Sequence, residues 1–213
     1  MRITGGEFGG RNLKVPKSDA IRPTQDRVRE ALFNIIQFEV PGCDFLDLFA
    51  GSGAVGLEAL SRGAKSATFV EANRRHLAVL KENLSHLCSP SPSSSPSPST
   101  FTFSVAGADA YSWLERYAGP GFSIGFADPP YALGEEKGYA AVLATLAERG
   151  VIRPGGIFIA EMTAVQKAEE TPGWELIRDR TYGKTRLCLW RRLASSVSRP
   201  SSPVSRLRPM SSV

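Results

Sequence analysis

The chain has 213 residues and a formal net charge of +5 at pH 7, which is enough length for one domain with a substantial hydrophobic core. No segment approaches the roughly 18 consecutive apolar residues of a membrane-spanning helix, and the N-terminus lacks the apolar stretch of a secretory signal. The three cysteines lie far apart and fit neither a zinc pattern nor a disulfide framework. These features exclude membrane-spanning and disulfide-stapled secreted proteins, and they predict a cytoplasmic protein without a metal site.

The positive charge lies at the two ends of the chain. Residues 1–30 contain seven Lys or Arg against four acids, and residues 191–213 contain five arginines and no acid. The segment between them is mildly acidic. Two basic ends that flank a mildly acidic segment favour an anionic polymer as the partner. For the tail, the simpler interpretation is a charged segment that keeps the chain in solution.

Residues 1–20 are predicted to form a β-hairpin extension, because two short alternating segments flank four glycines. A two-stranded ribbon is hardly stable alone, so it should pack on the main domain or on a partner. From Thr24 onward, apolar residues at helical spacing predict a helix that covers a sheet. The candidate contacts to nucleic-acid phosphate in and after the hairpin are Arg2, Arg11, Lys14 and Arg22.

The segment 45–56 has the pattern of a strand, a glycine turn and a helix. An apolar run interrupted only by Asp47 suits a buried parallel strand. Gly51 and Gly53 then allow a tight turn, and residues 54–61 are good helix formers. Exposed backbone amides and missing side chains let a ligand approach such a turn closely, so the segment predicts a cofactor site.

Two cofactors fit this turn. The spacing Gly51-x-Gly53-x-x-Gly56 matches the dinucleotide fingerprint, and Glu71 follows about 20 residues later, where an acid would hold ribose hydroxyls. The alternative is S-adenosylmethionine, whose cationic amino group and sulfonium call for a nearby carboxylate. Asp47 would supply that carboxylate, whereas it would repel a pyrophosphate.

Acids also stand at the ends of later predicted strands. Ligands bind at the carboxyl ends of strands in open parallel sheets, so we expect Glu71 to hold ribose and Asp109 to accept from an adenine amine. Residues 89–100 are rich in Ser and Pro and predict a flexible insertion in a loop. The other predicted strands are 67–70, 101–105, 122–127, 157–160 and a closing pair at 174–181 and 186–190.

The motif Asp128-Pro129-Pro130-Tyr131 directly follows a predicted strand and distinguishes between the two cofactors. The prolines stiffen the turn and leave carbonyl oxygens free to accept hydrogen bonds. Acceptors at one end and an aromatic face at the other suit a planar base that bears an exocyclic amine. Asp128 could orient that amine and take up its proton, while Tyr131 stacks on the ring and positions it. The motif therefore favours methyl transfer to a base amine.

At this point a family resemblance is clear. The segment Asp47-Leu48-Phe49-Ala50-Gly51-Ser52-Gly53, with Glu71, Asp109 and the Asp-Pro-Pro-Tyr motif, resembles the amino-methyltransferases of nucleic-acid bases. Three further segments narrow the resemblance to the bacterial small-subunit (16S) rRNA guanine-N2 methyltransferases of the RsmD type. They are Arg22-Pro23-Thr24, Arg29-Glu30-Ala31-Leu32-Phe33-Asn34 and Glu58-Ala59-Leu60-Ser61-Arg62-Gly63-Ala64. The resemblance covers residues 1 to about 190, and the Ser/Pro insertion and the tail depart from it.

The resemblance implies a class I methyltransferase (Rossmann-like) α/β fold, a three-layer sandwich around a seven-stranded, mostly parallel sheet with one antiparallel strand. This domain would span 21–193, before a disordered basic tail at 194–213. The partner implied is 16S rRNA, free or in a partly assembled small subunit, bound by a monomer. The residues implied for S-adenosylmethionine are Thr24, Asp47, Phe49, Ala50, Gly51, Gly53, Glu71 and Asp109, and those for the guanine are Asp128, Pro129, Pro130 and Tyr131.

Two other functions remain open from the sequence. One is methyl transfer to another base amine, such as adenine N6 in DNA or RNA. The other is a nicotinamide-dependent oxidoreductase, which the glycine spacing permits. No candidate proton donor stands near the site for that reaction, and Asp47 disfavours the dinucleotide.

Overall fold

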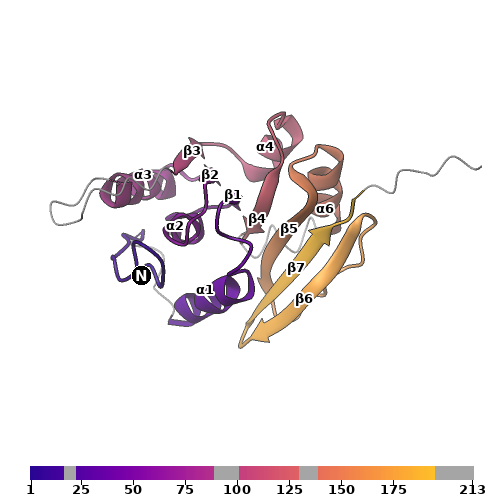
Figure 1. The fold of residues 1–213 in the computed structure, drawn as a ribbon, viewed down its shortest axis with the longest axis horizontal. Helices are drawn as coiled ribbons and strands as arrows, with labels where there is room; N and C mark the ends of the chain where they lie inside the picture. The colour runs from indigo at the N-terminus through magenta and orange to yellow at the C-terminus, as the bar shows by residue number, and fades with distance from the viewer. Residues whose placement is uncertain (17–22, 89–100, 130–138, 195–213) are drawn as a thin grey trace, which may run out of the picture.

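The structure is a computed structural model that describes residues 1–16, 23–88, 101–129 and 139–194 (Figure 1). Its strands form one seven-stranded sheet in the order β3-β2-β1-β4-β5-β7-β6. β1 to β5 run parallel to one another, and β7 is antiparallel to both β5 and β6. The predicted sheet with one antiparallel strand is therefore confirmed. The strands are β1 (Asp44–Leu48), β2 (Ser66–Val70), β3 (Thr102–Ala106), β4 (Phe122–Ala127), β5 (Ile152–Thr163), β6 (Trp174–Tyr182) and β7 (Thr185–Arg192).

Helices cover both faces of this sheet and complete the predicted three layers (Figure 1). α1, α2 and α3 pack on one face, and α4 and α6 pack on the other. β1 lies in the middle and sends Phe45 to the first face but Leu46 and Leu48 to the second, which explains its nearly continuous apolar run. The helices are α1 (Pro23–Ile35), α2 (Ala54–Ser61), α3 (Arg74–Cys88), α4 (Ala110–Arg116) and α6 (Tyr139–Glu148).

The predicted N-terminal hairpin is not confirmed as a pair of strands. Residues 1–16, which we call the N-terminal arm, fold back on themselves with an isolated antiparallel bridge between Arg2 and Asn12. Backbone hydrogen bonds cross the arm, as from the Ile3 N–H to the Arg11 carbonyl at 3.0 Å, and the N–H of Glu7 donates to the carbonyl of Ser61 at the end of α2, at 2.7 Å. The arm is thus an irregular segment docked on a helix.

Glycine and apolar residues of the N-terminal arm explain this docking. A Cβ at Gly6 would lie 1.9 Å from the carbonyl oxygen of Ser61, so only glycine permits the close approach. Ile3, Phe8 and Leu13 are buried in the core under the first face of the sheet. The glycines that favoured a hairpin turn serve helix contact as well, and the arm belongs to the main core.

Some predicted features lie outside the described residues or at their limits. The Ser/Pro segment 89–100 and the tail from residue 195 are outside them. α1 begins at Pro23, a favoured first helical residue, so Thr24 lies within the first turn. In the described part of the chain, no helix is long and apolar enough to span a membrane.

Candidate active site

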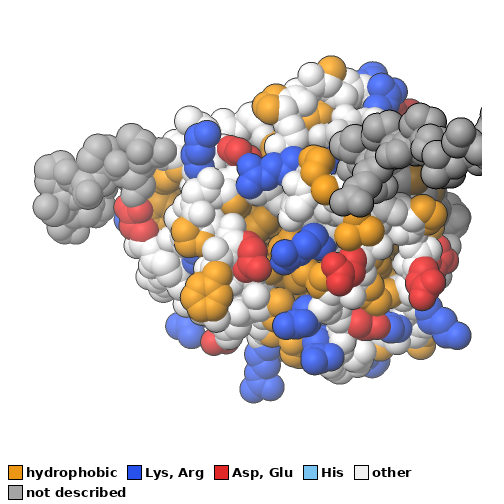
Figure 2. Space-filling view, turned by 45° about the vertical axis from the view of Figure 1, so that its right-hand side comes forward, with side chains coloured by type: hydrophobic (Ala, Val, Ile, Leu, Met, Phe, Trp, Pro, Cys, Tyr) orange, Lys and Arg blue, Asp and Glu red, His pale blue; other side chains and the backbone are white. Residues whose placement is uncertain are grey.

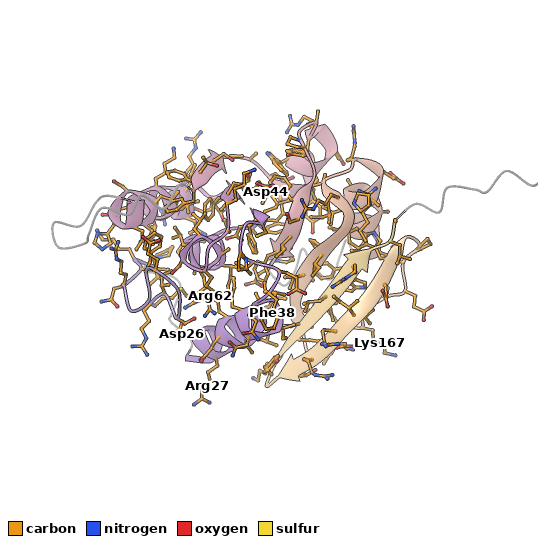
Figure 3. The ribbon with its side chains drawn as sticks, viewed as in Figure 1. Asp26, Arg27, Phe38, Asp44, Arg62 and Lys167 are labelled. Carbon is orange, nitrogen blue, oxygen red and sulfur yellow. The ribbon has the colours of Figure 1, made fainter. Side chains whose placement is uncertain are left out.

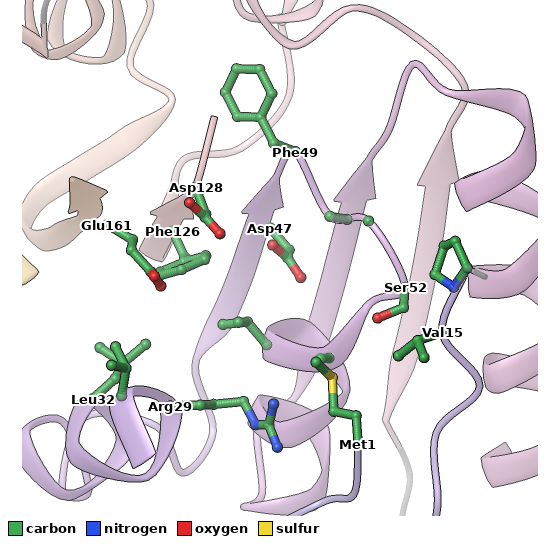
Figure 4. A pocket seen from close by; sticks show the side chains of 16 residues that line it. Met1, Val15, Arg29, Leu32, Asp47, Phe49, Ser52, Phe126, Asp128 and Glu161 are labelled. Carbon is green, nitrogen blue, oxygen red and sulfur yellow. The ribbon is translucent and has the colours of Figure 1, made fainter. Parts of the chain in front are cut away.

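A cavity of about 200 Å³ opens at the carboxyl ends of β1, β4 and β5. Figure 4 shows Asp47, Asp128 and Glu161 extending from these neighbouring strands into it, with Arg29 and Met1 on the opposite side. The cavity lies at the edge of the sheet where parallel α/β folds bind ligands. Its other lining residues are Val15, Pro16, Val28, Leu32, Phe49, Ala50, Gly51, Ser52, Ala54, Val55 and Phe126.

The turn after β1 bends sharply to reach α2. Phe49 has a φ of 59°, the one positive value for a non-glycine among the described residues, and Gly51 and Gly53 follow with 56° and 82°. A side chain larger than glycine is strained in this left-handed region, so Phe49 stores strain at the cavity wall. A Cβ at Gly51 would meet nothing closer than the Phe49 oxygen at 4.0 Å. The turn therefore leaves room for a ligand to reach the backbone.

Asp47 is almost fully buried beneath this turn, 1% exposed. Its Oδ2 accepts a hydrogen bond from the backbone N–H of Gly56 in α2, at 2.8 Å. Burial raises the pKa of Asp47 to about 7, and the nearby Asp128 and Glu71 carboxylates act in the same direction. A cationic ligand would offset this excess of buried acid, and S-adenosylmethionine is cationic.

Gly56, the last glycine of the Gly51-x-Gly53-x-x-Gly56 pattern, leaves no room for a side chain. A Cβ there would lie 2.3 Å from the ring of Phe69 and 3.1 Å from Asp47 Oδ2. We expect Gly56→Ala to displace the Asp47 carboxylate and to weaken S-adenosylmethionine binding at least about tenfold, the loss of one charge-assisted hydrogen bond. Isothermal titration would measure this effect. Gly150→Ala is the control for cofactor affinity: it strains the backbone at φ 67°, but a Cβ there meets nothing within 4 Å and the residue does not line the cavity.

Glu71 follows β2 and braces the glycine turn. Its Oε2 accepts from the backbone N–H of Gly51 at 2.7 Å, and its Oε1 accepts from the N–H of Asn73 at 2.6 Å. The side chain is 8% exposed. Each carboxylate oxygen can accept a second hydrogen bond, so this anchoring leaves Glu71 chemically able to hold ribose hydroxyls.

Asp109 has a clear structural role. It is the N-cap of α4, and its Oδ1 accepts from the backbone N–H of Ser112 at 2.9 Å. The side chain is exposed and does not line the cavity. Its predicted adenine contact stays a prediction.

Asp128 and Pro129 directly follow β4, as the sequence predicts. Asp128 reaches solvent through the cavity, but most of its surroundings are protein, and this desolvation raises its pKa to about 6. Pro129 is buried. Pro130 and Tyr131 lie outside the described residues, so the stacking face proposed for the base is a prediction.

Sequence reasoning missed Glu161, which lies on β5 and lines the same cavity. Burial raises its pKa to about 8, with the Asp128 carboxylate adding to the effect. The sequence signal was present, because an acid follows the apolar run 157–160 as Glu71 and Asp128 follow theirs. Glu161 was overlooked because it belongs to none of the segments on which the resemblance rests.

The N-terminal arm forms one wall of the cavity through Met1 and Val15. Asn83 of α3 fixes it there, accepting from the backbone N–H of Lys14 at 2.9 Å and donating to the Lys14 carbonyl at 3.0 Å. The same amide nitrogen donates to the carbonyl of Ser52 at 2.9 Å. One buried side chain thus ties the arm to the glycine turn.

The predicted RNA-contacting side chains differ in how they are held. Arg2 is exposed, and its carbonyl accepts from Arg29. Arg11 lies over the Phe8 ring, 5.1 Å from its centroid, and Lys14 forms an exposed ion pair with Glu82. Arg22 lies outside the described residues, as does the side chain of Thr24. Of this set, Arg2 is presented most openly to a partner.

A buried charge network anchors the arm beside the cavity. Glu58 of α2 is fully buried and accepts from the Thr4 N–H at 2.8 Å, the Thr4 hydroxyl at 2.7 Å and Arg62 Nε at 2.8 Å. Arg29 Nε lies 3.4 Å from Glu58 Oε2, and Arg29 lines the cavity. The network therefore links the position of the arm to the wall of the site.

The buried acids predict an unusual dependence of stability on pH. In the unfolded chain Asp47 and Glu161 have ordinary pKa values of 3.8 and 4.5, whereas the fold raises these pKa values to about 7 and about 8. Between these limits the folded state holds protons that the unfolded state releases, so stability falls as pH rises. We expect a higher melting temperature near about pH 5 than near about pH 8 for the ligand-free protein, measured by calorimetry. A double variant, Asp47→Asn with Glu161→Gln, should weaken this dependence, and an unchanged dependence would contradict the assignment.

The described residues contain no group of three or more His, Cys, Asp or Glu able to hold a metal ion. Carboxyl groups for an organic cation and an acid-proline corner for a base lie at adjoining strand ends, around a glycine turn. Together with the sheet order, they define a class I methyltransferase. The chain belongs to the family described as conserved hypothetical protein 95, whose model matches residues 1–191.

Relatives and solved structures agree with this class. Ribosomal RNA small subunit methyltransferase D of Escherichia coli K12 is 35% identical over 201 residues, covering 93% of each chain. The Haemophilus influenzae protein of the same name is 35% identical over 186 residues, covering 86% of this chain and 89% of that one. The solved structure of yhhF from Escherichia coli is 34% identical with a TM-score of 0.75, covering 91% of this chain and 98% of that chain.

Proposed function

We propose that this protein transfers a methyl group from S-adenosylmethionine to the exocyclic N2 of a specific guanine in small-subunit (16S) rRNA. The main observation in support is that the glycine turn after β1 and Asp128 after β4 line the same cavity. The names of the family relatives support ribosomal RNA of the small subunit as the substrate. Asp47 at the cavity wall disfavours the pyrophosphate of a dinucleotide.

The residues of the glycine turn hold the donor in this proposal. S-adenosylmethionine supplies an electrophilic methyl group on a positively charged sulfur. The open backbone at Gly51 and the carboxylates of Asp47 and Glu71 fit its cationic and hydroxyl groups. The excess buried acid of the cavity favours a cation over a neutral ligand. Phe49, Ala50 and Gly53 shape the turn around the donor, and Asp109 and Thr24 are proposed as outer contacts.

Asp128 is proposed to prepare the acceptor. A guanine amine is a poor nucleophile because its lone pair is delocalised into the ring. The Asp128 carboxylate accepts a hydrogen bond from the amine, orients it, and takes its proton as the new N–C bond forms and the S–C bond breaks. A pKa of about 6 leaves Asp128 mostly ionised at neutral pH and basic enough to act. Pro129, Pro130 and Tyr131 are proposed to hold the base against this group.

The rRNA is proposed to approach across the edge that carries the cavity. Figure 2 shows Lys and Arg side chains gathered along the lower edge of the molecule. Figure 3 places Arg27 of α1 and Lys167, after β5, at that edge, and both are exposed. Together with Arg2, Arg11, Lys14 and Arg22 of the N-terminal region, they are proposed to contact phosphate. We propose that the protein acts as a monomer in the cytoplasm, on 16S rRNA that is free or part of a partly assembled small subunit.

Methyl transfer from labelled donor tests the function directly. Naked 16S rRNA, small-subunit particles at successive assembly stages, tRNA and duplex DNA are supplied as parallel acceptors. The proposal expects label in small-subunit RNA, recovered after digestion as N2-methylguanosine. Label only in DNA, or recovery as N6-methyladenosine, would overturn it in favour of another base amine.

A further inference from the structure

Glu161 and Asp128 occupy equivalent places on adjacent parallel strands. β4 and β5 pair in register at Ala127 and Ala160, and the two acids are the next residues along each strand. Neighbouring strands lie about 4.8 Å apart, so the two carboxyl groups start side by side. Figure 4 shows both pointing into the cavity. The acceptor end of the site therefore has two carboxyl groups.

The surroundings of Glu161 are polar but do not neutralise it. The Thr185 hydroxyl of the adjoining strand β7 acts on its carboxyl as a hydrogen-bond donor and favours the ionised form, which lowers its pKa against the effect of burial. The Tyr139 hydroxyl donates to the backbone carbonyl of Glu161 at 3.0 Å. Among the described side chains that line the cavity, the cationic one is Arg29, and it is already paired with Glu58 and Asp26. No cationic side chain of the described cavity lining is thus left to pair with the Glu161 carboxyl.

The two carboxyl groups match the edge of one base only. In guanine, the ring N1–H stands next to the N2 amine, so two donors are adjacent on the same edge. In adenine and cytosine, the ring nitrogen beside the amine is an acceptor. A carboxylate facing that lone pair would leave both groups without a partner, which is costly in a buried site.

We propose that Glu161 determines base specificity by accepting a hydrogen bond from N1–H of the target guanine, while Asp128 accepts from the N2 amine. This inference rests on the proposed function. It assigns Glu161 a role that the Asp-Pro-Pro-Tyr motif does not supply, because that motif provides acceptors for an amine on any base. The Glu161 carboxyl group distinguishes a ring nitrogen that carries a hydrogen, as in guanine, from one that carries a lone pair, as in adenine and cytosine.

2-Aminopurine tests this assignment, because it keeps the N2 amine but has an acceptor at N1. The methylated guanine is first mapped in small-subunit rRNA by nuclease digestion and mass spectrometry. Matched RNAs with guanine or 2-aminopurine at that position are then made by splinted ligation. At about pH 8.5, above the pKa of Glu161, kcat/KM of the wild type should favour guanine at least about tenfold, the loss of one hydrogen bond to a charged group.

Glu161→Gln should abolish this preference, because the amide can accept from N1–H of guanine through its oxygen or donate to the N1 lone pair of 2-aminopurine through its N–H. The ratio of guanine to 2-aminopurine should fall at least about tenfold. Glu170→Gln, at an exposed glutamate outside the cavity, is the matched control and should keep the wild-type ratio. Thr185→Val is the second variant: it keeps the carboxyl group but removes the hydrogen bond that favours its ionised form, and it should lower the ratio partially.

The outcomes separate the inference from the proposed function. If the wild type labels no rRNA, the proposed function fails. If rRNA is methylated but Glu161→Gln and Thr185→Val both keep the wild-type ratio, the specificity role of Glu161 is wrong. A fall in kcat/KM that is equal for both bases would show a merely structural role and would also overturn it.

Discussion

Replacing Asp128 by alanine is expected to lower methyl-transfer turnover by about 10²–10⁴-fold, the usual contribution of a positioned general base. Affinity for S-adenosylmethionine should largely survive, because the glycine turn, Asp47 and Glu71 are untouched. Single-turnover methyl transfer and isothermal titration of the donor measure the two quantities separately. Near-normal turnover, or loss of donor binding equal to the loss of rate, would refute the role of Asp128.

Asp128→Asn sharpens this experiment. The amide oxygen can still orient the acceptor amine, but the side chain can no longer take up a proton. We expect a turnover between those of wild type and Asp128→Ala. The wild-type rate should rise with pH through about 6, where the Asp128 carboxyl ionises, and the asparagine variant should lack this step. A step retained in Asp128→Asn would assign the titration to another group.

Glu58→Ala is expected to be the most destabilising single change in the N-terminal half. Glu58 is fully buried and accepts three hydrogen bonds, so its removal leaves Arg29 as a buried charge with one fewer partner. Breaking a buried ion pair in this way costs about 3–5 kcal/mol. Chemical denaturation would measure the change in unfolding free energy.

Glu82→Ala is the matched control for that measurement. Glu82 also pairs with a residue of the N-terminal arm, Lys14, but both side chains are more than half exposed. Exposed pairs contribute about 0–1 kcal/mol, so the unfolding free energy should change little. Equal losses of unfolding free energy for Glu58→Ala and Glu82→Ala would show that burial does not determine how much these ion pairs stabilise the protein.

The sheet was predictable because its strands are signalled locally. Apolar runs such as 45–48 and 122–127 carry or precede an acid and lead into a turn, and this pattern is sufficient to predict Asp47, Glu71 and Asp128 at one edge of the sheet. α2 has the predicted bounds, 54–61. The family resemblance then implied the overall sheet, which periodicity alone does not determine.

The features that the sequence did not reveal arise where residues distant in sequence meet. The glycines near Gly6 fit a hairpin turn, but the backbone there hydrogen-bonds to Ser61 of a helix more than fifty residues away, which no local pattern reveals. Asp109 matched a cofactor motif, and the structure shows that it also caps a helix. The network of Glu58 and Arg29 was missed because buried ion pairs between helices have no sequence period.

Asn83 has a practical consequence. Because its single amide group binds both the backbone of Lys14 and the carbonyl of Ser52, the arm and the turn that faces the donor behave as one mechanical unit. A force applied to the arm by a docked RNA would be transmitted to the donor side of the cavity. We therefore expect alterations of the arm, by fusion or truncation, to change the affinity for the donor as well as the affinity for RNA.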